Sequence, residues 1–263
     1  MSSSFLGKTA LITGGASGIG HATAQQFVKQ GGQVIIADIN IEMGHNTAMN
    51  LSDNASFFKL DVSSEQNWID IMAYAEDTYG GLDFLVNSAG IGYATPFEDM
   101  PISEWNSLLS VNLTGTFLGC QKAISLMKKS PSSAAIVNIS SIGGLVGIED
   151  LAGYCASKGG VTMLTKSLAL YCAGKGYDIR CNSIHPTYVD SEMLDGVAET
   201  IGDRQTMLNS MASQIPLGRV AKPDDIARSI LYLCSSDATL VTGHQLVIDG
   251  GQLAGLTAQH SAD

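Results

Sequence analysis

Short apolar runs alternate along the chain with longer amphipathic stretches. The short runs are typical of buried strands, and the longer stretches are typical of helices that pack on one face. We expect strands at 9–13, 33–38, 56–60, 82–87, 134–140, 178–184 and 245–248. We expect helices at 18–30, 41–50, 64–79, 103–129, 153–173 and 223–233, and an irregular, Met-rich helical stretch at 190–215.

This alternation predicts the architecture. Nearly continuous apolar strands separated by helices indicate a parallel sheet that is covered by helices on both faces. We therefore expect one α/β domain over 1–263, built on a doubly wound sheet of about seven strands, with 188–215 as an insertion that acts as a substrate lid. In such sheets, ligands bind beyond the carboxyl ends of the strands.

Composition narrows the class of protein. The 263 residues are 45% hydrophobic and 15% charged, which is typical of a globular protein with a sizeable core. The net charge of −11 disfavours binding to nucleic acid or to anionic lipid. The N-terminus does not resemble a signal peptide, and no apolar run is long enough to span a membrane, so we expect a cytoplasmic protein. The spacing of the five cysteines and of the histidines suggests neither disulfides nor a metal site.

The first strand runs into a glycine-rich turn at 13–20, and a helix follows. Glycines let such a turn approach a pyrophosphate closely, while the helix N-terminus offers unpaired N–H groups to it. The glycines are Gly14, Gly18 and Gly20. Asp38, at the end of the second strand, is placed to bind a ribose 2′-hydroxyl and to repel a 2′-phosphate. With Ser17 in the turn and no Lys or Arg between positions 29 and 59, the pattern predicts a Rossmann-type site for NAD rather than NADP.

The spacing Thr-Gly-x-x-x-Gly-x-Gly, together with Tyr154-Cys-Ala-Ser-Lys158, resembles the short-chain dehydrogenase/reductase family. The resemblance extends over 8–251. Ser88 and Thr187 stand where that family has Asn and Gly. The Asn-Ser-Ile-His-Pro segment at 182–186 is similar to the bacterial 3β/17β-hydroxysteroid dehydrogenase branch.

The resemblance implies a set of site residues. The implied catalytic residues are Asn112, Ser141, Tyr154 and Lys158. The cofactor contacts expected from the turn and from the family are Gly14, Ser17, Gly18, Ile19, Gly20, Asp38, Ile39, Asp61, Val62, Asn87, Ala89, Gly90, Tyr154, Lys158, Pro186, Val189 and Ser191. Members of the family are commonly homotetramers, and we expect the same here.

Tyr154 and Lys158 are four positions apart, so they lie on one face of a helix. A free tyrosine titrates near 10, and a nearby cation favours its phenolate form. We expect Lys158, together with the positive nicotinamide of the oxidised cofactor, to lower the pKa of Tyr154 toward ~7, so that it serves as general base in oxidation and general acid in reduction. Ser141 would hold the substrate oxygen, and Ser140 should point to the opposite side. By resemblance, Asn112 would kink its helix around a water that connects Lys158 to solvent.

Two other candidate residues are interpreted as structural. The Tyr-x-x-x-Lys spacing recurs at Tyr171 and Lys175, near a helix end broken by glycines and without a serine 13 residues upstream. We interpret this second copy as surface. His185 precedes a proline at a strand end, where a lone histidine usually has a structural role.

The predicted lid and the apolar run after Ser141 suggest the substrate. Methionines suit an adaptable apolar pocket, and a segment after the sixth strand can cover the site. The expected substrate contacts are Ser141, Ile142, Ile148, Tyr154, Tyr188, Met193 and Leu194. They predict an apolar or alicyclic secondary alcohol or ketone, with a hydroxysteroid as one candidate. Glu149 and Asp150 near the mouth disfavour an anionic substrate.

Two other functions remain open. A 3-oxoacyl-carrier-protein reductase usually uses NADPH and presents a basic patch, and Asp38 and the net charge of −11 oppose both. A non-catalytic NAD-binding regulator is opposed by the complete catalytic set, although an intact set is not a measured rate.

Overall fold

The computed structural model describes residues 5–130, 133–195 and 202–255. Seven parallel strands form one sheet in the order β3-β2-β1-β4-β5-β6-β7. The strands are β1 (Thr9–Thr13), β2 (Gln33–Asp38), β3 (Ala55–Lys59), β4 (Phe84–Asn87), β5 (Ala134–Ile139), β6 (Ile179–Pro186) and β7 (Gln245–Ile248). The strand order reverses between β1 and β4, where doubly wound sheets bind their ligands. The predicted α/β fold is confirmed.

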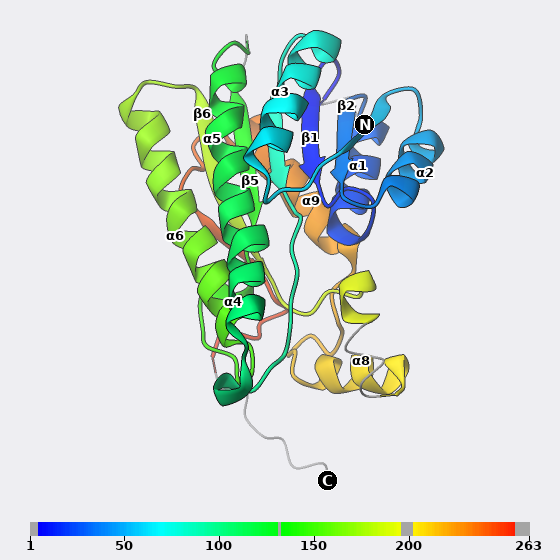
Figure 1. The fold of residues 1–263 in the computed structure, drawn as a ribbon, viewed down its shortest axis with the longest axis vertical. Helices are drawn as coiled ribbons and strands as arrows, with labels where there is room; N and C mark the ends of the chain where they lie inside the picture. Colours follow the sequence, from blue (N-terminus) through cyan, green and yellow to red (C-terminus); the bar gives the residue numbers. More distant parts are fainter. Residues whose placement is uncertain (1–4, 131–132, 196–201, 256–263) are drawn as a thin grey trace.

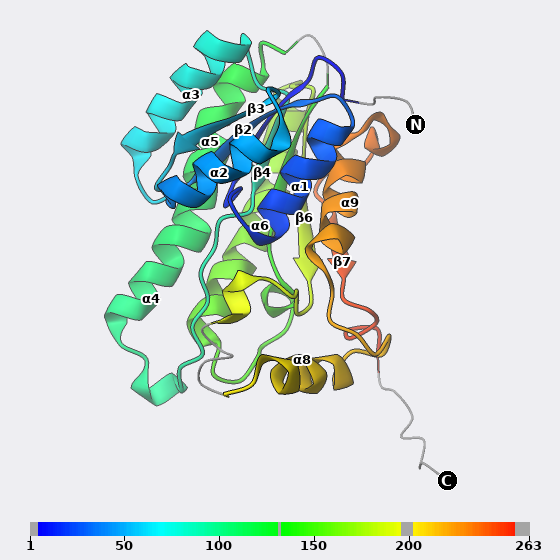
Figure 2. The ribbon, with the colours of Figure 1, turned by 90° about the vertical axis from the view of Figure 1, so that its right-hand side faces the viewer.

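Helices cover both faces of the sheet (Figures 1 and 2). One face carries α3 (Glu65–Tyr79), α5 (Gly115–Met127) and α6 (Ala152–Gly174), and the other carries α1 (Gly18–Lys29), α2 (Ile41–Leu51) and α9 (Pro223–Cys234). Each face has its own core, and successive strand residues alternate between the two. In β1, Leu11 packs with Trp68 in one core, whereas Ile12 packs with Phe27 in the other. Burial on both faces explains why the strands are apolar throughout.

The helix predicted over 103–129 is interrupted. It consists of α4 (Ile102–Leu108), the π-helical turn η2 (Leu109–Thr114) and α5. Apolar periodicity does not reveal such a turn, because the extra residue changes the hydrogen bonding but not the direction of the chain.

Two predicted strand boundaries shift by two residues. Strand β4 begins at Phe84 rather than at 82, and Asp83 before it accepts a hydrogen bond from the backbone N–H of Thr9 through its side chain. Strand β6 continues to Pro186, where it pairs with Ile248 of β7.

The segment after β6 lies beyond the carboxyl ends of the strands, at the bottom of Figure 1. It contains the 3-10 turn η4 (Glu192–Leu194) and α8 (Arg204–Ser213), and residues 196–201 of the predicted lid lie outside the described residues. Three further 3-10 turns are η1 (Phe97–Asp99), η3 (Ile142–Gly144) and η5 (Ser236–Ala238).

All five cysteines are free thiols, as predicted, and four of them are buried. Within the described ranges, no helix is long and apolar enough to cross a membrane. The same residues contain no group of three or more His, Cys, Asp or Glu side chains that could hold a metal ion.

Candidate active site

The turn after β1 brings the backbone against the end of β4. A Cβ atom at Gly14 would lie 2.9 Å from the Cα atom of Ala89, and Gly14 has a φ of +61°. Only glycine tolerates both conditions. Oγ1 of Thr13 accepts hydrogen bonds from the backbone N–H groups of Ser88 and Ala89, each at 3.0 Å. The hydroxyl of Thr13, which the sequence analysis did not single out, therefore fixes this close approach.

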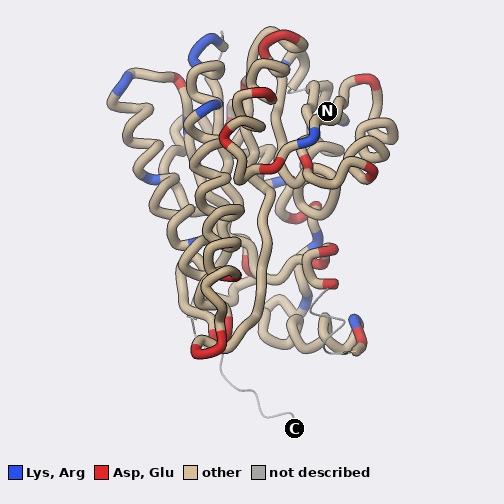
Figure 3. The backbone as a smooth tube through the Cα atoms, viewed as in Figure 1, with Lys and Arg blue, Asp and Glu red and all other residues tan. Residues whose placement is uncertain are grey.

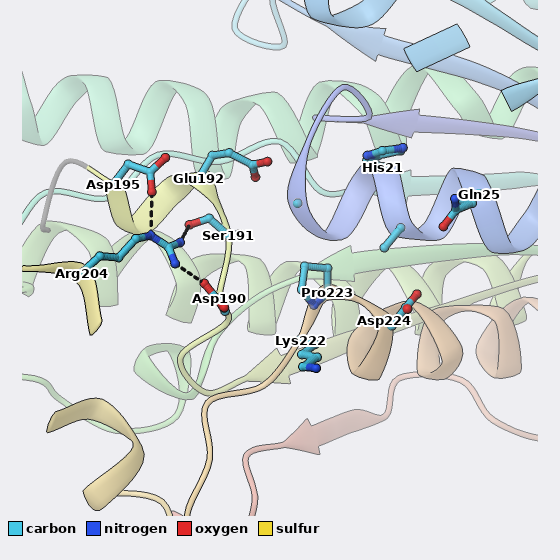
Figure 4. Close-up of a pocket in the computed structure, with 12 residues that line it drawn as sticks. His21, Gln25, Asp190, Ser191, Glu192, Asp195, Arg204, Lys222, Pro223 and Asp224 are labelled. Carbon is cyan, nitrogen blue, oxygen red and sulfur yellow. Dashed lines mark hydrogen bonds and ion pairs between the residues drawn. The ribbon is translucent and has the colours of Figure 1, made fainter. Parts of the chain in front are cut away.

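Helix α1 begins directly after this turn, at Gly18. In the described structure the Ser17 side chain does not cap the helix, so its first N–H groups are available to an anion. A Cβ atom at Gly18 would lie 3.3 Å from the Cβ atom of Ser191, so the segment after β6 closes over the turn. Gly18 and Ser191 line an open cleft of about 630 Å³ (Figure 4). The bare helix N-terminus and the close glycine backbone fit the pyrophosphate of a dinucleotide.

Asp38 lies beside the same turn. Its Oδ2 atom accepts a hydrogen bond from the backbone N–H of Ala16 at 3.1 Å, and its Oδ1 atom accepts one from that of Asn40 at 3.0 Å. These bonds orient the carboxylate, and each oxygen keeps a lone pair that can accept a ribose hydroxyl. The neighbouring Ile39 is 64% exposed and offers an apolar surface at the same strand end.

Three of the expected cofactor residues turn their side chains toward the protein. Oδ1 of Asp61 accepts hydrogen bonds from the backbone N–H and the hydroxyl of Ser63, at 2.9 and 2.7 Å. Val62 is buried, and Nδ2 of Asn87 donates to Oδ1 of Asn138 at 2.8 Å within the sheet. The side chains of Val62 and Asn87 therefore face the core, which leaves their backbone atoms for any contact with a cofactor.

The other expected cofactor residues lie at the start of α1 or at strand ends, on the same side of the sheet as the glycine-rich turn. Ile19 is in the first turn of α1, Ala89 and Gly90 follow β4, and Pro186 ends β6. Val189 forms an isolated bridge with Ala221.

Asn112 is fully buried in the π-helical turn η2. Its Oδ1 atom accepts from the N–H of Ile91, and its Nδ2 atom donates to the carbonyl of Ile91, both at 2.9 Å. Nδ2 also donates to Oγ of Ser157 on α6 at 3.0 Å. A π-helical turn interrupts the helix at Asn112, and the side chain joins the segment after β4 to the helix that carries Tyr154; the kink around a water stays a prediction.

The two serines after β5 have different partners. Oγ of Ser140 donates to the carbonyl of Lys158 at 2.9 Å, which directs it toward α6. Oγ of Ser141 accepts from the N–H of Gly143 at 3.1 Å and is near enough to the Tyr154 phenol to lower its pKa. Of the two hydroxyls, that of Ser141 therefore lies at the tyrosine.

Tyr154 and Lys158 project from the N-terminal part of α6. Burial raises the pKa of Tyr154, and the hydrogen bond with Ser141 acts in the opposite direction. Burial lowers the pKa of Lys158 to about 8. Its Nζ donates to the carbonyl of Ile139 at 2.8 Å and lies 5.7 Å from the centroid of the Tyr154 ring.

The expectation that Lys158 and a positive nicotinamide together lower the pKa of Tyr154 toward ~7 stays a prediction. Among the protein groups, burial is the largest influence and raises the pKa of Tyr154, while the Lys158 ammonium donates to the end of β5. The positive ring of an oxidised nicotinamide would supply the charge that favours phenolate.

Arg204, at the start of α8, holds the segment after β6 through three contacts (Figure 4). Its Nη1 atom lies 2.6 Å from a carboxylate oxygen of Asp190, and its Nε atom lies 3.1 Å from one of Asp195. Its Nη2 atom donates to the carbonyl of Ser191 at 3.2 Å. Sequence analysis missed Arg204, although it is the single basic residue among five acidic ones in 188–215.

Side chains around Tyr154 form the expected substrate side. Ile142 is buried, and a Cβ atom at Gly143 would lie 3.3 Å from Cδ1 of Ile148. A Cβ atom at Gly92 would lie 3.6 Å from Cδ2 of Tyr154, so the absence of a side chain at Gly92 leaves room beside the ring.

The residues of the predicted lid are more exposed to solvent than Ile142. Met193 is 51% exposed, Leu194 is half-buried, and Oη of Tyr188 donates to Oε1 of Gln214 at 3.2 Å.

The rim of this region is acidic. The backbone N–H of Thr95 donates to the carbonyl of Asp150 at 2.8 Å, and its hydroxyl donates to Glu104 at 2.6 Å. These bonds join the segment that leads into α4 to the loop before α6. Figure 3 shows acidic residues gathered at this lower end of the molecule.

The chain is similar to proteins of known class along most of its length. Residues 14–252 match the family model described as enoyl-(acyl carrier protein) reductase. The NADP-dependent (R)-specific alcohol dehydrogenase of Lentilactobacillus kefiri is 39% identical, over 94% of this chain and 97% of that protein. A 3-alpha-(or 20-beta)-hydroxysteroid dehydrogenase of Mycobacterium bovis is 40% identical, over 97% of this chain and 93% of that protein. The crystal structure of a short-chain dehydrogenase/reductase of Brucella melitensis, described as a glucose/ribitol dehydrogenase, aligns with a TM-score of 0.88 and 31% identity, over 96% of this chain and 99% of that one.

Proposed function

Because this chain belongs to the short-chain dehydrogenase/reductase family, we propose that it is an NAD-dependent enzyme that interconverts a secondary alcohol and a ketone. The observation that carries the proposal is the placement of Ser141, Tyr154, Lys158 and Asn112 at one end of the sheet, beside the glycine-rich turn. The Ser141 side chain is near enough to the phenol that would move the proton to lower its pKa. A bound nicotinamide would accept the hydride from the alcohol or deliver it to the ketone.

The protein groups divide the proton chemistry among them. Oη of Tyr154 takes the hydroxyl proton of the alcohol in oxidation and returns one to the carbonyl oxygen in reduction. Ser141 donates a hydrogen bond to the same substrate oxygen and so fixes its distance from Tyr154. The resemblance to the family assigns Lys158 to the nicotinamide ribose, and the positive charges of Lys158 and of an oxidised nicotinamide would together favour the phenolate of Tyr154.

Asp38 is the basis for the proposed preference for NAD. Its carboxylate is oriented by two backbone N–H groups and can accept the ribose hydroxyls. A 2′-phosphate at the same place would meet a like charge, which costs roughly 1–4 kcal/mol at short range. The relative from Lentilactobacillus kefiri is NADP-dependent, so the cofactor does not follow from the family alone.

The proposed substrate is apolar or alicyclic, in line with the hydroxysteroid relative. Ile142, Ile148 and Leu194 are the apolar side chains that we propose line the substrate site, while Glu149 and Asp150 disfavour an anion. The acidic rim and the net charge of −11 also oppose an acidic carrier protein, which makes 3-oxoacyl-carrier-protein reductase the weaker candidate.

The test is a steady-state assay with NAD and NADP on a series from cyclohexanol to a hydroxysteroid, with a sugar alcohol as the polar comparison. We expect a higher kcat/KM with NAD. Asp38→Ser should reduce the NAD:NADP ratio of kcat/KM by roughly 10- to 100-fold. Asp53→Ser removes an exposed carboxylate away from the turn and should leave the ratio unchanged.

Three outcomes would contradict parts of the proposal. A higher kcat/KM with NADP would overturn the role of Asp38. A sugar alcohol that is a better substrate than every cyclic alcohol would overturn the apolar pocket. NAD binding without turnover of any alcohol would favour the regulator.

We also propose that the enzyme is a homotetramer. Phe117 on α5 and Met163 and Leu170 on α6 are 43%, 62% and 75% exposed, and large apolar side chains clustered on neighbouring helices are typical of subunit interfaces. Light scattering after size-exclusion chromatography measures the mass directly, and a monomer at assay concentration would contradict this state.

A further inference from the structure

His185 is fully buried near the end of β6, and both of its ring nitrogens have partners. Nδ1 lies 2.9 Å from the carbonyl oxygen of Ser141, and Nε2 lies 2.8 Å from Oγ of Ser183. The imidazole therefore connects β6 to the residue whose hydroxyl lies at Tyr154.

The partners determine which nitrogen carries the proton. A carbonyl oxygen can only accept, so Nδ1 carries the hydrogen and donates it to Ser141. Nε2 then accepts the hydroxyl hydrogen of Ser183. Burial lowers the pKa of His185, and the charges of Lys166 and Lys158 act in the same direction, so the ring is neutral in this arrangement.

Ser141 lies directly after the end of the sheet pairing. The last residue pair between β5 and β6 is Ile139 with Ile184, and the N–H of Ser140 still donates to the carbonyl of Ile184 at 2.8 Å. Beyond that pair, the N–H of Gly144 reaches the Ser141 carbonyl at 3.0 Å, and the N–H of Gly143 reaches its Oγ at 3.1 Å. Both donors belong to the short turn η3, which directly follows Ser141. The bond from His185 is the contact that ties the Ser141 carbonyl to a sheet strand.

We propose that His185 is a positioning residue for the reaction: it fixes the backbone of Ser141 and thereby the direction of the Ser141 hydroxyl toward Tyr154 and the substrate oxygen. The inference rests on the proposed function and adds a residue that touches neither substrate nor cofactor. His185 does not itself transfer a proton to substrate, because it is buried and both ring nitrogens are engaged.

Two substitutions separate this role from simple core packing. In His185→Asn, the side-chain amide can occupy the place of Nδ1 and still donate to Ser141. In His185→Gln, the amide lies near the place of Nε2, which retains the contact with Ser183 and loses the one with Ser141. Both variants replace an aromatic ring by a smaller amide, so their packing losses are similar.

The experiment measures kcat, the KM for NAD, the melting temperature and the pH profile of alcohol oxidation for both variants. We expect His185→Gln to lower kcat about tenfold, since small misplacements of a catalytic group have effects of this size or larger. Its pH profile should move to higher pH, because the hydrogen bond with Ser141 lowers the pKa of Tyr154. His185→Asn should stay within about threefold of wild type, with the KM for NAD and the melting temperature alike in the two variants.

A second readout does not depend on turnover. In protein labelled at tyrosine Cζ, the NMR signal of Tyr154 is identified by its loss in Tyr154→Phe. We expect Ser141→Ala and His185→Gln to move this signal in the same direction at pH 8, and His185→Asn to leave it in place.

Equal kcat values in the two histidine variants, or a loss that follows the melting temperature alone, would overturn the proposal. So would a Tyr154 signal that is unchanged in His185→Gln. If wild type turns over no alcohol but the signal moves as expected, the proposed function fails while the positioning role stands.

Discussion

Helix α6 and its C-cap residue carry two Tyr-x-x-x-Lys pairs with nearly the same internal geometry. In the first pair, Nζ of Lys158 lies 5.7 Å from the centroid of the Tyr154 ring, and in the second, Nζ of Lys175 lies 5.8 Å from that of Tyr171. Their surroundings differ. Lys158 is buried against the end of β5, whereas Tyr171 is 50% exposed and Lys175 follows the last residue of the helix.

The comparison shows that the motif itself is not the site. Burial raises the pKa of Tyr154 and lowers that of Lys158. Of the two pairs, only this one lies beside Ser141 and the glycine-rich turn after β1. The spacing places two side chains on one helical face, and the neighbouring strand ends determine whether that face can do chemistry.

The largest expected effect comes from a comparison of two variants, each of which lacks the phenol hydroxyl of one pair. Tyr154→Phe should lower kcat by ~10²-fold or more, because the proton of the alcohol then has no acceptor. Tyr171→Phe deletes the same atom from a half-exposed ring and should leave kcat unchanged. Steady-state kinetics with NAD, together with NAD affinity from fluorescence titration, checks both variants. Equal losses of kcat, or a loss explained by weaker NAD binding, would contradict the assignment of Tyr154.

Lys158 and Lys175 should differ in their contribution to the free energy of unfolding. The pKa of Lys158 is lowered from 10.5 to about 8 in the folded state, so between these values the unfolded chain holds more protons than the folded one. Stability therefore rises with pH across this window, and below about pH 8 the buried ammonium costs the fold roughly 3 kcal/mol. Lys158→Met should be more stable than wild type at pH 7, and this advantage should shrink toward pH 10.

Urea unfolding at several pH values measures this difference. Lys175→Met, at the exposed end of α6, serves as the matched control and should show no such pH-dependent gain. A gain in Lys158→Met that is the same at pH 7 and pH 10 would mean that the lysine is not desolvated.

A third test concerns the network that only the first pair possesses. Asn112→Ala removes the bonds to Ile91 and Ser157 and leaves buried partners unsatisfied, which costs about 1–3 kcal/mol for each such group. We expect kcat to fall about tenfold as the start of α6 loosens. Asn106→Ala, an exposed change in α4, should have little effect on either quantity. A stable Asn112→Ala enzyme with wild-type kcat would show that this network does not position the first pair.

Much of this arrangement could be predicted from the sequence, because local patterns dictate it. Buried strands, the glycine turn, Asp38 at a strand end and the face shared by Tyr154 and Lys158 all follow from spacing. The break in the helix around Asn112 was predicted as a kink, but its π-helical form depends on Ile91 and Ser157, which are distant in sequence.

What could not be predicted depends on contacts between distant segments. The Lys158 ammonium donates to the carbonyl of Ile139, and burial by distant segments raises the pKa of Tyr154. The bonds of Arg204 to Asp190 and Asp195 likewise form only when the segment after β6 folds back on itself.

The smallest expected effect concerns the segment after β6, which we propose covers the substrate at the first pair. Met193 is in the segment after β6 and is 51% exposed, so a bound substrate could bury the remaining half of it. Each buried CH₂ group contributes ~0.8 kcal/mol, so Met193→Ala should raise the KM for a steroid-sized alcohol about two- to fivefold. The kcat should hardly change, because such a contact is made equally in the ground state and the transition state. Cyclohexanol is too small to reach the segment fully and should lose less. Met49→Ala, an exposed change in α2, controls for the loss of a surface methionine. If Met193→Ala lowers kcat and leaves KM unchanged for both alcohols, the segment takes part in the chemical step rather than covering the substrate.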